Sequence, residues 1–225
     1  MTKSFRTQAI VLRRTNYGEA DRILQFITPT GRHAAIARGA RREKSKLAGG
    51  IELFAMSDIV IAEGKGELGI VTSARLIEFY RHILEDYERL QFAYEVVKQV
   101  ARASEMVNEP EWFAVLAEVL AALDKRETPL MLIETWFYLR HAELLGHALN
   151  VRLDVTGSVL SADMSYVYDV SEQGLRAATT GEIAADHIKF LRLASSKPIM
   201  TLAQIGGLQS ILPLCLMTAR QHAGL

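Results

Sequence analysis

The chain has 225 residues, 49% of them apolar, with few glycines and prolines, which excludes a disordered or fibrous protein and is typical of a globular chain with one or two cores. Its net charge is zero, and its single cysteine, Cys215, excludes an internal disulfide and every zinc site built mainly from thiolates. No apolar stretch reaches the ~18 residues of a membrane span, and no run typical of a signal peptide follows Met1, so we expect a cytoplasmic protein without membrane contact.

Alternating or β-rich runs predict five short strands in a first domain of residues 1–80, each ended by a turn signal. Five such strands fit a small closed barrel of the oligonucleotide/oligosaccharide-binding (OB) class, because closure removes exposed edges. An SH3-like barrel is the alternative. Phe26 and Phe54 are expected inside strands, in the core. The predicted strands cover residues 5–13, 22–28, 33–38, 51–63 and 68–78.

A mainly α-helical second domain is expected over residues 81–225, because the hydrophobic period changes to 3.6 there, and the whole chain therefore belongs to the α+β class. Its first helices are predicted at 83–106 and 111–123. A third helix follows, with Thr128 as its N-cap and Pro129 at its first helical position.

The segment 147–180 has no helical period and contains one possible hairpin, around residues 172–174. Two further helices are predicted after it. The first covers residues 181–193, and the second begins at Thr201, where Gln204 completes a capping box.

Residues 64–69 match the dinucleotide-binding pattern G-x-G-x-x-G and follow a predicted strand. That pattern binds pyrophosphate only where the third glycine opens a helix, and here residues 70–72 are β-prone. The sequence therefore predicts a hairpin turn. No Walker A pattern, paired histidines or catalytic cluster occurs, so we expect neither an enzyme nor a bound metal or cofactor.

The charge is distributed unevenly along the chain. Residues 1–50 carry eleven lysines and arginines against three acids, a net charge of +8, and the remaining 175 residues carry −8. The richest stretch, 38–46, has five cations and one acid between two strands, and we expect a mobile loop that gains most when phosphates neutralise it. The alternative is an ordinary solvated loop. The candidate nucleic-acid contacts are Arg38, Arg41, Arg42, Lys44 and Lys46, supported by Arg13 and Arg14, with Tyr17 able to stack on a base.

These same residues carry a family resemblance. In order and spacing the sequence resembles the RecO family of recombination mediators, strongly over residues 9–80 and more weakly, but in the same order, afterwards. The matching segments are Ala-Ile-Val-Leu at 9–12, Tyr-Gly-Glu-Ala-Asp-Arg-Ile-Leu at 17–24, Gly31, Ala-Arg-Gly-Ala-Arg-Arg at 37–42, Lys-Ser at 44–45, Leu-Phe at 53–54, Gly-Lys-Gly at 64–66, Trp-Phe-Tyr-Leu-Arg at 136–140 and Glu-Leu-Leu-Gly at 143–146.

The resemblance implies an OB-fold barrel, a helical C-terminal domain and binding to single- and double-stranded DNA without catalysis. It also implies annealing of complementary strands and help in loading RecA recombinase onto DNA coated by single-strand-binding protein, in a cytoplasmic, nucleoid-associated setting. The implied protein partners are RecR and the acidic C-terminal tail of single-strand-binding protein. Arg140 matches a family arginine in the helical domain and is the candidate contact for that tail; an ordinary helix-surface arginine is the alternative.

The sequence departs from the family in one respect. Many members have a four-cysteine zinc motif after the leucine–glycine segment, whereas residues 147–192 contain no cysteine, so no metal is carried over and the fold of this stretch stays open. Two other functions also remain open. One is an OB-fold RNA-binding factor. The other is a metal-dependent nuclease, which needs clustered acids, although residues 1–50 offer only Glu19, Asp21 and Glu43.

Overall fold

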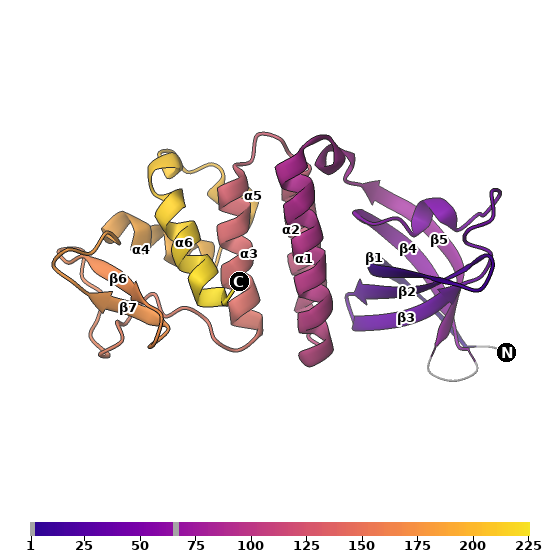
Figure 1. The fold of residues 1–225 in the computed structure, drawn as a ribbon, viewed down its shortest axis with the longest axis horizontal. Helices are drawn as coiled ribbons and strands as arrows, with labels where there is room; N and C mark the ends of the chain where they lie inside the picture. The colour runs from indigo at the N-terminus through magenta and orange to yellow at the C-terminus, as the bar shows by residue number, and fades with distance from the viewer. Residues whose placement is uncertain (1–2, 65–67) are drawn as a thin grey trace. The chain divides into compact units, whose positions relative to one another are not determined.

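The computed structural model describes residues 3–64 and 68–225 and divides into two compact units, residues 1–124 and 125–225 (Figure 1). The first unit contains a closed five-stranded barrel and two long helices, and the second contains helices and one small hairpin. The predicted α+β class, an N-terminal five-stranded OB-type barrel followed by a mainly helical region, is confirmed. No helix in the described ranges is long and apolar enough to cross a membrane.

The barrel has the strand order β1-β2-β3-β5-β4, and β4 also pairs with β1. All pairs are antiparallel except β3 with β5, which pair in parallel at Ala35–Gly69 and Ile36–Ile70 and close the barrel. This Greek-key order is that of an OB-fold, and it does not support the SH3-like alternative. The strands are β1 Ser4–Tyr17, β2 Asp21–Thr28, β3 Gly31–Ala37, β4 Ala55–Ala62 and β5 Gly69–Phe79.

Side chains that alternate inward along the strands fill the barrel. The interior cluster includes Ala9 and Val11 of β1 and Phe26 of β2, all nearly inaccessible to solvent. One end of the barrel is closed by the connection between β3 and β4, which inserts Ala40 and Ile51 into the same cluster. The barrel therefore has a packed interior and one end sealed by a loop.

Two helices pack on the outside of the barrel. Helix α1 (Tyr87–Met106) contacts β1 and β3, and α2 (Glu111–Leu123) contacts β1, β2 and β3. Apolar residues at outward positions, such as Ile10 and Ile27, are fully buried although they lie outside the interior cluster. Strand β5 ends at Phe79, next to the domain boundary expected at residue 80, whereas the compact units divide after Asp124, so both helices belong to the first unit.

The first helical stretch begins later than its hydrophobic period predicts. Residues Arg81–Glu85 form a 3-10 turn, η2, and α1 starts after Asp86, whose carboxylate accepts a hydrogen bond from the Arg89 amide at 3.1 Å. The extended backbone of the N-cap Asp86 separates the 3-10 turn from α1. The spacing of apolar residues is helical on both sides of this break, which is why the sequence predicts one continuous helix.

The second unit is built around α3 (Leu130–Leu144), which packs against α4 (Ala185–Ala194), α5 (Ile199–Leu202) and α6 (Leu212–Ala223). Most of α3 is buried, and its Trp136 Nε1 donates to the Lys197 carbonyl at 2.9 Å. A short 3-10 turn, η3 (Leu208–Ser210), precedes α6.

In the second unit, three predicted helix starts were wrong. Pro129, not Thr128, is the N-cap of α3, and the helix begins at Leu130. Helix α4 begins at Ala185 rather than 181, because Ile183 forms a bridge to Tyr166 with hydrogen bonds of 2.9 Å in both directions. Thr201 lies inside the short α5, so it caps nothing.

The predicted hairpin is present, as β6 (Tyr166–Asp169) and β7 (Gly174–Ala177). It has its own apolar cluster, formed by Leu160, Tyr166, Leu175, Ile183 and Ile188. A buried histidine of α6, His222, also contacts the hairpin. Its Nε2 donates to the His147 carbonyl at 2.6 Å, and its Nδ1 therefore accepts from the Tyr168 hydroxyl of β6 at 2.9 Å.

Two adjacent glycines in the loop that closes the barrel should differ in their tolerance of alanine. A Cβ at Gly50 would lie 2.5 Å from the Ala74 carbonyl oxygen, which is backbone, whereas a Cβ at Gly49 would meet nothing within 4 Å. Gly50→Ala should lower the free energy of unfolding by about 1–3 kcal/mol, and Gly49→Ala should leave it unchanged or raise it slightly. Urea unfolding measures both, and equal effects would contradict the close approach.

The stability of the second unit should depend on pH through His141. This side chain is 5% exposed, and burial, with a smaller contribution from nearby His147, lowers its pKa to about 4. Between its ordinary pKa of 6.5 and 4 the unfolded chain binds a proton that the folded chain excludes, so stability falls as the pH falls. From pH 7.5 to pH 5 the loss should be about 2 kcal/mol.

Urea unfolding of His141→Leu at the two pH values provides the comparison. The variant should lose most of that pH-dependent difference, whatever its stability at pH 7.5. The same slope in both proteins would show that His141 does not titrate in this way.

Candidate nucleic-acid interface

The basic segment is held at its base by the turn between β1 and β2. The Gly39 amide donates to the Asp21 carboxylate at 2.7 Å, and the Arg41 amide donates to the Ala20 carbonyl at 2.9 Å. Between them Ala40 is 4% exposed and packs into the barrel interior. Gly39 has a φ of +63°, which a residue with a side chain adopts only with strain. The loop expected to be mobile is therefore anchored on both sides of Ala40.

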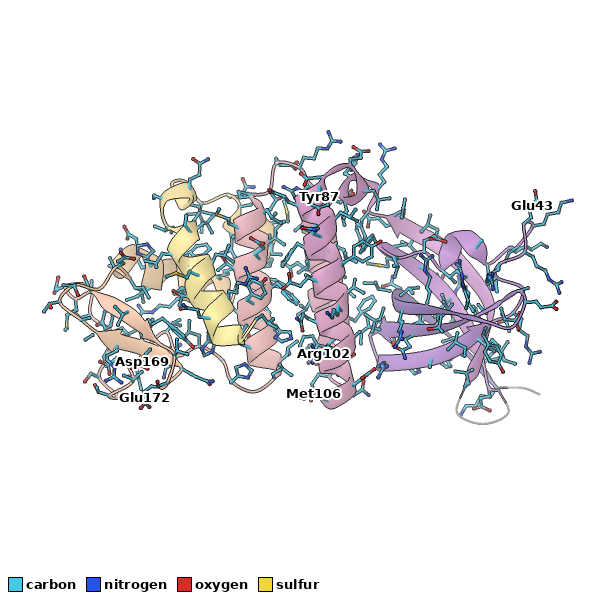
Figure 2. The ribbon with its side chains drawn as sticks, viewed as in Figure 1. Glu43, Tyr87, Arg102, Met106, Asp169 and Glu172 are labelled. Carbon is cyan, nitrogen blue, oxygen red and sulfur yellow. The ribbon has the colours of Figure 1, made fainter. Side chains whose placement is uncertain are left out.

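The five cations of this segment all point into solvent. Arg38, Arg41, Arg42, Lys44 and Lys46 are exposed, and within residues 3–64 and 68–225 none of their side chains makes a hydrogen bond or ion pair. The one acid among them, Glu43, projects from the tip of the loop (Figure 2). The segment thus presents unneutralised positive charge on an ordered backbone. We call residues 38–46 the basic loop.

The two supporting arginines differ in their surroundings. Arg13 is exposed on β1, whereas Arg14 forms an ion pair with Glu52 at 2.5 Å, and its side chain is only 24% exposed. Neighbouring residues of a strand point to opposite faces, so the two guanidinium groups do not form one cluster. Arg14 carries a partner already and offers less free charge than the sequence indicates.

A groove lies beside the basic loop on the outer face of the barrel. Its volume is about 720 Å³, and Arg38 stands at one side of it. Tyr17, which is 55% exposed, also lines it from the end of β1. The structure therefore brings the predicted stacking residue and one predicted cation together at a single concave surface.

Three isoleucines form the floor of this groove, and sequence reasoning missed them. Ile23 pairs with Ile36 across β2 and β3, and Ile36 pairs with Ile70 across β3 and β5. Each lies at an outward position, next to an inward residue such as Leu24 or Ala35. The sequence does contain a signal for them: each of the three strands has an isoleucine at a position where the alternating pattern predicts a solvent-facing, polar residue.

The two phenylalanines predicted to be core are both buried. Phe26 lies within β2, but Phe54 lies in the turn before β4, with a φ of 57°, and its ring packs edge-on against Tyr94 with centroids 4.9 Å apart. The prediction that Phe54 is part of a strand was wrong. Neither ring is available for stacking on a base.

The glycine pattern at 64–69 lies partly outside the described residues, since 65–67 belong to the gap. Gly69, its third glycine, begins strand β5. A strand cannot supply the helix N-terminus that binds pyrophosphate, so the dinucleotide interpretation has no structural support.

Arg140 lies on α3 in the second unit. Its guanidinium forms an ion pair with Glu143 one turn later and lies 6.0 Å from the centre of the Trp136 ring. Its Nε is buried and has no hydrogen-bond partner in the described chain, and the side chain as a whole is 25% exposed. Arg140 is thus partly accessible and held by two neighbours, one of them acidic.

No group of three or more histidine, cysteine, aspartate or glutamate residues in the described ranges is arranged to hold a metal ion. Cys215 is buried, and burial raises the pKa of its thiol to about 12, so it is not a thiolate at neutral pH.

The sequence comparisons agree with this architecture. The family model described as recombination protein O, N-terminal, matches residues 1–80, a range that includes all five strands of the barrel. A DNA repair protein RecO from Roseiflexus sp. RS-1 is 33% identical over 211 residues, covering 87% of this chain and 71% of the relative. DNA repair proteins RecO from Dehalococcoides mccartyi strain 195 and from Synechococcus elongatus are 34% and 35% identical, over 68% and 60% of this chain.

The chain spans 61% and 53% of the length of the latter two relatives. The match to the Roseiflexus protein extends through most of both chains, so it includes the helical unit as well as the barrel. The family expected from the sequence is therefore confirmed, and the chain belongs to the RecO family of DNA repair proteins.

Proposed function

We propose that this protein binds DNA as a recombination mediator in DNA repair and performs no covalent chemistry. The observation that supports this most directly is the basic loop, which lies on an anchored backbone beside the groove of Tyr17. Its five cations are exposed and make no side-chain hydrogen bond or ion pair with any residue that the structure describes. Phosphate groups of a nucleic acid can neutralise these cations. The groove offers an aromatic ring and an apolar floor on which unstacked bases can pack.

The proposed mechanism is binding alone. Arg38, Arg41, Arg42, Lys44 and Lys46 neutralise phosphates of single- or double-stranded DNA, with Arg13 adding to them. Two complementary strands held on one basic surface repel each other less, which favours annealing. Arg14 contributes only if its ion pair with Glu52 opens.

In this proposal the second unit engages proteins. Arg140 is the candidate contact for the acidic C-terminal tail of single-strand-binding protein, because a guanidinium binds carboxylates in bidentate geometry. Competition for the tail would loosen the coating protein and let RecA recombinase nucleate, with RecR as a further partner. The protein would act in the cytoplasm, associated with the nucleoid.

An OB-fold RNA-binding factor remains the second candidate, because the basic loop and the groove of Tyr17 would serve an RNA strand equally well. Competition between DNA and RNA oligonucleotides of the same sequence separates the two, and stronger competition by DNA is expected.

The basic loop should determine the salt dependence of DNA binding. If five to seven phosphates are neutralised, log affinity for single-stranded DNA should fall with log salt at a slope of about −3.5 to −5. Replacing Arg41, Arg42 and Lys44 by alanine should flatten the slope by about 2 and weaken binding without changing sequence preference. Fluorescence anisotropy across a salt series measures both quantities.

A matched control removes three exposed cations elsewhere in the same unit, Arg81, Lys98 and Arg102. It lowers the net charge equally and should change the slope much less. Both variants should keep a melting temperature within a few degrees of the parent, because no core residue is exposed. A loop variant that is folded and retains the parental slope would place the DNA surface elsewhere.

Arg140→Ala should weaken binding to the tail of single-strand-binding protein and leave affinity for naked DNA nearly intact. Glu143→Gln should tighten tail binding, because it frees the Arg140 guanidinium from its present partner. Arg152→Ala, an exposed cation of the same unit, is the control. Calorimetry with a tail peptide measures all three, and an equal loss of peptide and DNA binding in Arg140→Ala would contradict the separation of roles.

A further inference from the structure

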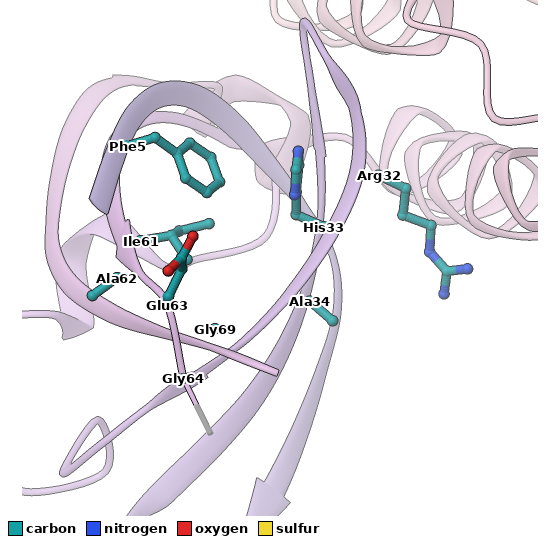
Figure 3. Close-up of a pocket in the computed structure, with 9 residues that line it drawn as sticks. All are labelled: Phe5, Arg32, His33, Ala34, Ile61, Ala62, Glu63, Gly64 and Gly69. Carbon is teal, nitrogen blue, oxygen red and sulfur yellow. The ribbon is translucent and has the colours of Figure 1, made fainter. Parts of the chain in front are cut away.

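A second hollow lies at the end of the barrel that the basic loop does not close. Its volume is about 540 Å³, within the range of pockets for small flat ligands. Figure 3 shows Phe5, Ile61 and Glu63 on one side of it and His33 on the other. None of these residues was a candidate in the sequence.

Strand alternation explains why these side chains meet. Phe5 has the same parity as Ala9 and Val11 on β1, and His33 has the same parity as Ala35 on β3, so both rings point toward the barrel axis at its end. Their centroids are 5.2 Å apart, with the ring planes tilted by 50°. The Thr30 hydroxyl lies 3.2 Å from His33 Nε2 and orients the imidazole.

Two of the residues that line the hollow are glycines without room for a side chain. A Cβ at Gly69 would lie 2.5 Å from Ile61 Cγ2, and a Cβ at Gly64 would lie 2.0 Å from the Leu68 carbonyl oxygen. Neither position accommodates a side chain, so neither glycine fills the space beside Phe5 and His33. Phe5 is consequently 42% exposed, an unusual state for a residue that points toward the axis of a small barrel.

The charge in the hollow is negative. The Glu63 carboxylate lies beside Ile61 at the opening (Figure 3) and makes no hydrogen bond or ion pair in the described part of the chain. Arg32 also lines the hollow, but its guanidinium points away and pairs with Glu105 at 2.6 Å. A phosphate is therefore repelled here, whereas a flat ring with N–H donors finds an aromatic surface and an acceptor.

We propose that this hollow, lined by Phe5, His33, Ile61 and Glu63, is a pocket for one unpaired nucleobase, with guanine preferred. Guanine offers two adjacent donors, N1–H and N2–H, to a carboxylate, whereas adenine and cytosine offer one amino group and thymine offers one imide N3–H at that edge. The pocket adjoins the groove of Tyr17, since Glu63 and Gly64 line both. A single strand that leaves the groove can thus place a base here.

This inference rests on the proposed nucleic-acid binding and adds a base-specific contact to it. Phosphate contacts carry no sequence information, so the basic loop alone predicts no guanine preference and no distinction between a strand and its duplex at Phe5. A base pocket predicts both, because a base in a duplex is stacked and paired and cannot enter.

The experiment compares short oligothymidylates that carry guanine, inosine or thymine at every third position, as DNA and as RNA, with a duplex of the guanine sequence. Inosine lacks only the N2 amino group. Replacing guanine by inosine should lower the affinity of the parent protein at least about fivefold. If DNA and RNA lose affinity equally when guanine is replaced by inosine, the pocket accepts bases from both nucleic acids. If only one of them shows the loss, the pocket is specific for that nucleic acid.

Phe5→Ala should weaken binding to the guanine-containing strand by about 5- to 150-fold, the range for loss of one stacking contact, and leave duplex affinity unchanged. Phe5→Tyr should restore binding. Phe79→Ala, which removes an aromatic ring 39% exposed on β5 outside the hollow, is the matched control and should change nothing.

Glu63→Gln should abolish the difference between guanine and inosine while keeping or raising affinity for oligothymidylate, because a negative charge near the phosphates is lost. If the parent and Glu63→Gln proteins discriminate guanine from inosine equally, or if Phe5→Ala and Phe79→Ala bind alike, there is no base pocket even though DNA binding stands. If the parent binds neither strand nor duplex, the proposed function itself fails.

Discussion

Closure of the barrel between β3 and β5 is the constraint on which both candidate surfaces depend. Among the described residues two pairs make this parallel contact, Ala35–Gly69 and Ile36–Ile70. The first pair points inward and is small, which allows the strands to approach and leaves space above Ile61. The second pair points outward and forms part of the floor of the groove. A single register therefore creates a hollow on one side of the sheet and an apolar track on the other.

The barrel strands could be predicted from the sequence because their signal is local. Alternation and turn residues located all five strands to within a few residues, and helix α2 has the predicted bounds. The helix starts of the second unit could not be predicted in the same way. Ile183 continues the hairpin by pairing with Tyr166, a contact seventeen positions away in the chain that overrides the helical period.

The same distinction applies to the candidate site. The cations of residues 38–46 and Tyr17 were evident as residue types, and the structure places them at the surface. The Arg14–Glu52 pair, the three outward isoleucines and the Phe5–His33 contact all join residues far apart in sequence. Their meeting depends on strand register, which composition does not determine. Arg14, for example, counts as a free cation in the sequence, but in the fold its charge is paired with the Glu52 carboxylate.

The anchoring of the basic loop has a consequence for the entropy of association. Hydrogen bonds from the amides of Gly39 and Arg41, together with burial of Ala40, fix the backbone before any ligand arrives. In the proposed DNA complex the cost of ordering that backbone belongs to folding, so each phosphate contact would lose only side-chain freedom. If the loop binds DNA as proposed, an encounter would require no search for a productive backbone conformation, and diffusion with long-range electrostatic attraction would set the rate of capture. An ordered backbone bearing flexible cations is suited to rapid exchange between strands.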